Sequence, residues 1–76
     1  MNNIRRGNLW EIIANIEKIK NKLELLRDEE DEYIENIPEN FQSSERYEKA
    51  VNARECMEEA VYSLEEAVNN IETATE

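Results

Sequence analysis

Five acidic side chains stand in a row at residues 28–32, where the chain reads DEEDE. Carboxylates in such a run could bind a hard metal ion, present negative charge to a basic protein surface, or keep a helix hydrated. The run falls near the end of a predicted long helix, where the helix dipole makes each exposed acid unfavourable by about 0.3–1 kcal/mol. These acids break a local rule, which is a feature expected of functional surfaces.

Spaced at intervals of three and four residues, five acids are expected to form one outward ridge on this helix. The members of this acidic ridge are Glu24, Asp28, Asp31, Glu32 and Glu35. Three interpretations stay open: a solvated face, a surface for a basic protein partner (including phosphate mimicry at a nuclease or DNA-binding site), and a divalent-metal site. A straight helix face cannot wrap a metal ion, and no Ca²⁺-loop spacing with its turn glycine is present. We therefore expect neither a metal nor another cofactor.

Catalysis would have to use carboxylates, because the chain has no histidine and so lacks every Ser-His or Cys-His arrangement. Helical nucleotide pyrophosphohydrolases hold Mg²⁺ with a Glu-Glu-x-x-Glu helix and a Glu-x-x-Asp helix. In this chain Tyr33 and Tyr62 stand where the third acid of each Glu-Glu motif is needed. The sequence thus predicts no catalytic residues and no enzyme.

Composition restricts the classes of protein and partner. The chain has 76 residues, a formal net charge of −10, one Gly and one Pro, which indicates a single small helical domain. This charge argues against direct binding of DNA, RNA or an acidic membrane. No apolar run approaches the roughly 20 residues of a membrane span, and Cys56 has no partner for a disulfide. The stretch MNNIRRGNLW has no apolar core region, so it is not expected to be a secretion signal. We expect a cytoplasmic protein that gains stability from a partner or from self-association.

The apolar residues of the two predicted helices, which must pack to hold the acidic ridge in place, follow two heptad stripes. In the first, the a and d positions are Leu9, Ile12, Ile16, Ile19, Leu23, Leu26, Glu30, Tyr33 and Ile37. Asn8 is the predicted N-cap with Glu11 as its reciprocal partner, and residues 3–7 either extend the helix or fray. Pro38 disfavours helical geometry before it, so this helix is predicted over about residues 8–36.

A loop over residues 37–43 precedes the second predicted helix, at about residues 44–73, with Ser43 or Ser44 as its N-cap. Its a and d positions are Tyr47, Ala50, Arg54, Met57, Val61, Leu64, Val68, Ile71 and Thr75. Alanine precedes four of the a positions, at residues 53, 60, 67 and 74. These small side chains thin one flank of the stripe, so that another helix can approach closely.

Together the two stripes predict an all-α fold, an antiparallel two-helix hairpin. Layering a positions on d positions pairs Leu23 with Met57, and the e positions then pair Arg27 with Glu58, with opposite charges. By the same rule Lys20 faces Glu65 and Leu9 shares a layer with Ile71. The two charged stripe residues, Glu30 and Arg54, are predicted to form a cross-helix ion pair that fixes register, unless both side chains bend out to water.

Several apolar side chains exceed what one hairpin can cover. Trp10, Leu25, Cys56 and Tyr62 lie off the main stripe, either as incidental exposed residues or as a second surface for a partner, with Trp10 and Tyr62 as candidate contacts. With Ile13, Ile34, Val51 and the alanine flank, the stripe is also wider than one hairpin can cover. Two hairpins meeting as a homodimeric four-helix bundle would bury the excess.

The segments LRDEEDEYIENIPENFQSSERYEKA and MEEAVYSLEEAVNNIETA resemble small acidic proteins encoded by bacteriophages and prophages of Gram-positive bacteria. This resemblance spans nearly the whole chain and implies a phage accessory protein with no assigned activity. The leading hypothesis is a non-enzymatic protein that acts by protein–protein interaction in the bacterial cytoplasm. The alternatives are an acidic DNA-mimic inhibitor of a host defence nuclease or nucleic-acid-binding protein, and a small structural component of the virion or its assembly.

Overall fold

The first helix begins earlier than its heptads predict. In a computed structural model of the chain, which describes residues 1–76, α1 spans Asn3–Glu35. Asn2 is extended and its side-chain oxygen accepts a hydrogen bond from the backbone N–H of Arg5 at 2.7 Å. The cap is therefore Asn2, and the predicted cap at Asn8 is wrong, because Asn2 satisfies the first free amides and no residue before Asn8 interrupts the helix. Even Gly7 is helical, with nothing within 4 Å of the position of a Cβ.

The turn between the helices is built around Pro38. Asn36 caps the C-terminus of α1 by donating its backbone N–H to the carbonyl of Glu32 at 3.2 Å. Pro38 then leads into a short 3₁₀ helix, η1 (Glu39–Phe41). The second helix, α2, spans Glu45–Ala74, and its N-cap is Ser44, whose Oγ accepts from the N–H of Tyr47 at 3.2 Å. Of the two predicted capping serines, the structure selects the second.

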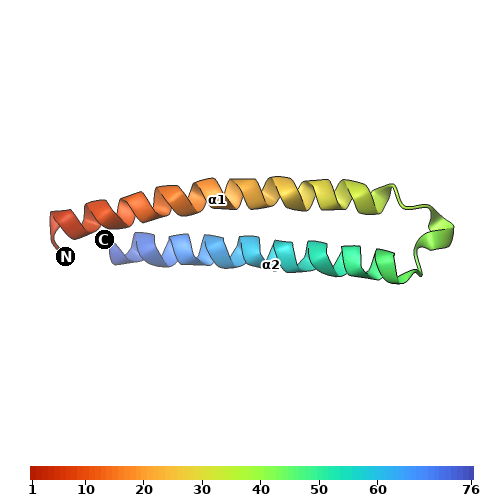
Figure 1. Cartoon of the computed structure of the whole chain (residues 1–76). Coiled ribbons are helices and arrows are strands. Elements are labelled where there is room, and N and C mark those ends of the chain that lie inside the picture. Colours follow the sequence, from red (N-terminus) through yellow and green to blue (C-terminus); the bar gives the residue numbers. More distant parts are fainter.

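Helices α1 and α2 pack against each other along their length as an antiparallel hairpin (Figure 1), which confirms the predicted all-α fold of two packed helices. The molecule is a rod of 59 × 15 × 13 Å. The two chain termini lie together at the end away from the loop (Figure 1), and there Arg6 Nε donates to the backbone oxygen of Thr75 at 3.0 Å.

Two ion pairs between the helices confirm the predicted register. Lys20 Nζ lies 3.7 Å from a carboxylate oxygen of Glu65, and Arg27 Nη1 lies 3.3 Å from one of Glu58. These are the opposite-charge e-position pairs expected from the sequence. They also place the e positions of both helices on the same side of the helix–helix contact.

The face that α1 turns to α2 differs from the predicted a/d stripe. Ile13 and Ile34, both at e positions, are the buried residues of α1 at 7% exposure, while the d positions are 44–59% exposed. The exposed d residues are Ile12, Ile19, Leu26 and Tyr33. A single neighbouring helix covers only a narrow strip, and this strip contains Ile13, Ile34 and the aliphatic stems of the paired Lys20 and Arg27. The predicted d positions are therefore wrong for α1, whereas its apolar a positions Leu9, Ile16 and Leu23 are half-buried.

Helix α2 keeps its predicted a and d positions inside. Ala50, Val61 and Val68 are buried, at 6%, 3% and 4% exposure. No large side chain of the chain is fully enclosed, since each helix has only one neighbour. The core is thus a single line of apolar side chains between two helices.

Candidate functional site

One side of the hairpin is apolar along most of its length. Because the e positions share one side of the contact, the d positions of α1 and the g positions of α2 lie on the other side. We call this the apolar side, and its residues are Ile12, Ile19, Leu26 and Tyr33 of α1 with Ala53, Ala60 and Ala67 of α2. The four large side chains recur every seven residues over roughly 32 Å of helix. The heptad stripe predicted these four side chains in the core, as d positions. Their spacing of seven residues identifies this surface once α1 is rotated so that its e positions face α2.

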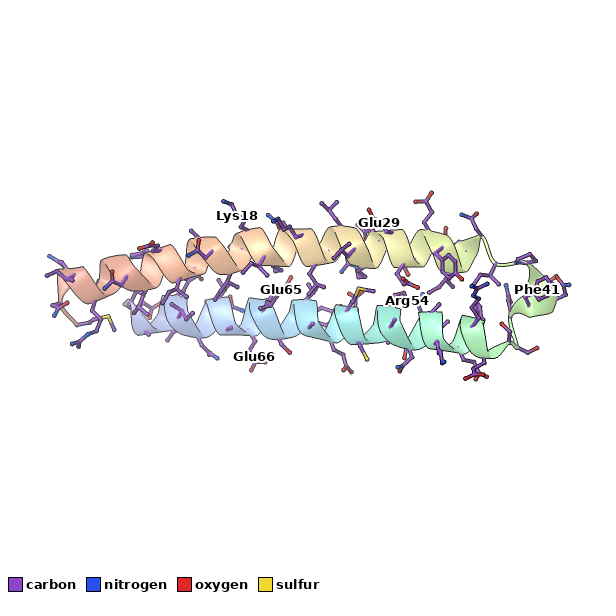
Figure 2. All side chains as sticks on the ribbon, in the orientation of Figure 1. Lys18, Glu29, Phe41, Arg54, Glu65 and Glu66 are labelled. Atoms are coloured by element: carbon purple, nitrogen blue, oxygen red, sulfur yellow. The ribbon has the colours of Figure 1, made fainter.

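The opposite side of the contact is acidic, and its two basic residues are already engaged. We call it the acidic side; it carries the b and e positions of both helices, with Glu17, Glu24, Asp31, Glu58 and Glu65 as its half-buried acids. Figure 2 shows Glu65 directed toward α1, whereas Glu66 points out to solvent. Lys20 and Arg27 each have one carboxylate partner on their own helix and one on α2.

Ion pairing raises the pKa of both basic residues on the acidic side. The pKa of Lys20 is raised above 10.5, first by its hydrogen bond with Glu17 at 3.3 Å and then by the charges of Glu17 and Glu65. The pKa of Arg27 is likewise raised, first by its hydrogen bond with Asp28 and then by the charge of Glu58. Both side chains stay protonated through the physiological range.

Arg54 forms a cross-helix ion pair, but its partner is not Glu30. Arg54 Nη1 donates to a carboxylate oxygen of Asp31 at 3.1 Å, and both side chains are partly exposed. Figure 2 shows Arg54 reaching into the space between the helices. Glu30 is half-buried and forms no ion pair. The predicted Glu30–Arg54 pair is wrong because α1 is rotated, so that its b position, Asp31, faces the arginine.

The predicted acidic ridge does not stand as one free row. Asp28 is bound by Arg27 at 3.1 Å, and Asp31 is bound by Arg54. Glu24 is half-buried at the acidic side, while Glu32 and Glu35 are exposed and form no ion pair. Of the five ridge carboxylates, these last two are the ones free to contact a partner.

Trp10 and Tyr62 are both exposed, at 52% and 60%, and both occupy b positions on the acidic side, at different levels along the rod. The contact of Arg6 with Thr75 sets the level of the open end, and measured from that level Trp10 and Tyr62 are separated by about 13 Å along the axis. Leu25 and Cys56 are exposed as well. All four of these residues are therefore exposed, and a contact with a partner through Trp10 and Tyr62 stays a prediction.

No protein family, curated protein or solved structure matches this chain. Its surfaces therefore carry the functional argument.

A pocket at the loop end was not anticipated from the sequence. It has a volume of about 330 Å³ and is lined by Tyr33, Ile37, Pro38, Phe41, Ser44 and Arg46. Phe41 sits at the tip of the hairpin (Figure 2), and aromatic residues on both sides of Pro38 are the sequence signal that could have indicated it. Because Tyr33 belongs to the apolar side, the pocket continues that side to the loop.

The charged side chains of the hairpin are spread along the rod. No three acidic or cysteine side chains come together as metal ligands. Neither helix is long and apolar enough to cross a lipid bilayer. The pocket holds one cation, Arg46, and no carboxylate, so it lacks an acid–base pair. What the hairpin presents is a long apolar side and a long acidic side.

Proposed function

We propose that this protein is a non-enzymatic interaction protein, which binds another protein surface through its apolar side. The observation that supports this proposal is the row of large apolar side chains Ile12, Ile19, Leu26 and Tyr33, which are 44–59% exposed. A contiguous apolar surface on a soluble chain marks a site of contact with another molecule. Helices recognise partners through side chains of this kind at regular helical spacing.

Affinity capture tests this function. A tagged chain is used to capture proteins from host cells that also make the untagged chain, and the Leu26→Lys variant is compared with it. The variant places a charge in the centre of the apolar side without touching the helix contact. The matched control is Lys18→Glu, which changes the outward residue labelled in Figure 2. Proteins lost with Leu26→Lys and kept with Lys18→Glu support the proposal; identical captures from all three chains contradict it.

The cellular role that we propose rests on the resemblance of the sequence to phage and prophage proteins. We place the protein among accessory proteins that act in the bacterial cytoplasm, with a structural role in the virion as the alternative. Mass spectrometry of purified particles separates the two. Presence in the particle at stoichiometric amounts supports the structural role, and early expression with absence from particles supports the accessory role.

A second candidate function uses the charge of the chain. The exposed, unpaired carboxylates of Glu32 and Glu35, together with the net charge of −10, favour an inhibitor that occupies the basic site of a host nuclease or nucleic-acid-binding protein. The double variant Glu32→Lys/Glu35→Lys should then lower affinity for the target, and binding should weaken steeply as salt is raised. A target whose binding is indifferent to salt and to both substitutions would rule this function out.

A further inference from the structure

The occupant of the apolar side follows from its area, its register and its charges. We propose that a second copy of this chain covers it, in a four-helix bundle whose two-fold axis runs parallel to the hairpins. In this arrangement α1 of each copy packs on α2 of the other. The inference rests on the proposed function, because it names the protein surface that the apolar side binds.

The exposed area of the hairpin matches the need of a dimer. The chain exposes 5830 Å², whereas a compact monomer of 9.0 kDa exposes about 4,900 Å². The difference, roughly 900 Å², is close to the area of about 800 Å² that each partner contributes to a stable interface. Packing two hairpins side to side along the apolar side removes an area of this size.

The register places each large side chain of α1 close to an alanine of α2. Tyr33 and Arg46 line the same pocket, so they lie within about one turn of each other along the axis. Because both helices repeat every seven residues, Leu26 lies equally near the level of Ala53, and Ile19 near that of Ala60. Ile12 lies near the level of Ala67 by the same step.

A two-fold axis parallel to the helices keeps every residue at its own level. Large side chains of α1 then meet the alanines of the partner's α2, and the two helices can approach to the 8–10 Å of well-packed helices. A two-fold axis across the helices would instead stack α1 on α1, large on large, and α2 on α2, small on small. Such a pairing leaves unequal gaps, which packing disfavours.

Charges on the rim of the apolar side complement each other in the same arrangement. Arg46 forms no ion pair within the hairpin, and Lys49 pairs only with Glu45 of its own helix at 3.4 Å, with both side chains largely exposed. Both cations lie within about one turn of the level of Glu29 and Glu32 on α1. Figure 2 shows Glu29 directed away from α2 of its own chain. In the dimer these acids are offered to the cations of the other copy.

Mass and cross-linking in solution test the dimer and its geometry. Light scattering coupled to size exclusion should give twice 9.0 kDa for the native chain and 9.0 kDa for Leu26→Lys. For geometry, Cys56→Ser chains carrying Ile19→Cys are mixed with Cys56→Ser chains carrying Ala60→Cys and oxidised. The expected product is the mixed disulfide, with the outward Glu66→Cys in place of Ala60→Cys as the control that stays uncross-linked.

Each outcome decides between the claims. The doubled mass together with the Ile19–Ala60 cross-link supports the arrangement. A monomeric mass up to millimolar concentration overturns the dimer, and a dimer that cross-links a Leu26→Cys chain to itself but gives no mixed product overturns the parallel axis. The proposed function is judged separately: a monomer that still loses captured host proteins on Leu26→Lys keeps the function and refutes only the dimer.

Discussion

Arg54 of α2 donates to Asp31 of α1 at 3.1 Å, one residue beyond the glutamate that the heptad assigns to it. The displacement of this pair from Glu30 records the rotation of α1 about its own axis. The same rotation buries Ile13 and Ile34 and exposes the d positions, Leu26 among them. A single contact thus reports which face of the first helix is covered.

A double-mutant cycle measures this pair. The coupling between Arg54→Ala and Asp31→Asn should be about 0.5–1 kcal/mol in the free energy of unfolding, because both side chains are partly exposed and solvent screens their attraction. The matched cycle uses Glu30→Gln in place of Asp31→Asn and should give no coupling. The measurement is denaturation with urea, followed by circular dichroism. A larger coupling in the Glu30 cycle would show that Arg54 pairs with Glu30, as the heptad predicts.

Shortening a core side chain should lower the free energy of unfolding clearly, although the core is only a single line of apolar side chains. Val61→Ala removes two buried carbons and should lower the free energy of unfolding by about 1.5 kcal/mol. Leu25→Ala is the control, since Leu25 is 65% exposed and its loss should cost less than about 0.5 kcal/mol. Urea denaturation at one fixed protein concentration compares the variants, and equal effects would mean that Val61 is not enclosed.

Substitution of the glycine tests where α1 begins. Because Gly7 lies inside the helix with open space around it, Gly7→Ala should raise the free energy of unfolding by roughly 0.5–1 kcal/mol. Asn2→Ala should lower it by about 1 kcal/mol through loss of the cap, while Asn8→Ala should not. The reverse result for the two asparagines would move the start of the helix back to Asn8.

Alkaline pH should remove the contribution of Lys20. Its pKa is raised in the folded chain by the hydrogen bond with Glu17 and by the charge of Glu65, so the stabilisation is fully present below the unfolded pKa of 10.5 and is lost as pH rises through the folded value. The difference in unfolding free energy between the native chain and Lys20→Gln should therefore shrink above that pH. A difference that stays constant would show that the lysine makes no ion pair in solution.

The hairpin and its register could be predicted from sequence because they depend on features that repeat. Pro38 and the serine cap fix the turn, and the opposite charges at Arg27 and Glu58 agree with the register that this turn sets. The rotation of α1 could not be predicted in the same way. Apolar side chains occur at its a, d and e positions alike, so periodicity leaves the covered face undecided. The stems of Lys20 and Arg27, at the other two e positions, settle it only through their reach to specific acids.

The candidate site, too, was predicted where it depends on spacing in the sequence and was not predicted where it depends on packing. The acidic ridge is a correct statement about spacing along one helix, and Asp28 is bound by its neighbour Arg27 on that helix. Arg54, which binds Asp31, comes into range only through the rotation of α1 and the neighbouring helix. The loop pocket depends on how η1 folds back toward Tyr33, which no periodic signal encodes.

Both ends of the chain lie at the same end of the rod (Figure 1). A pulling force applied through these ends acts across the helix contact and not along it, so it loads one layer of side chains at a time. The bond between Arg6 and Thr75 is the first to open, and rupture then travels toward the proline turn like a zipper at low force. Anchored by its ends, this molecule would yield gradually under tension, whereas the same pair of helices held at opposite ends would resist until the whole contact sheared at once.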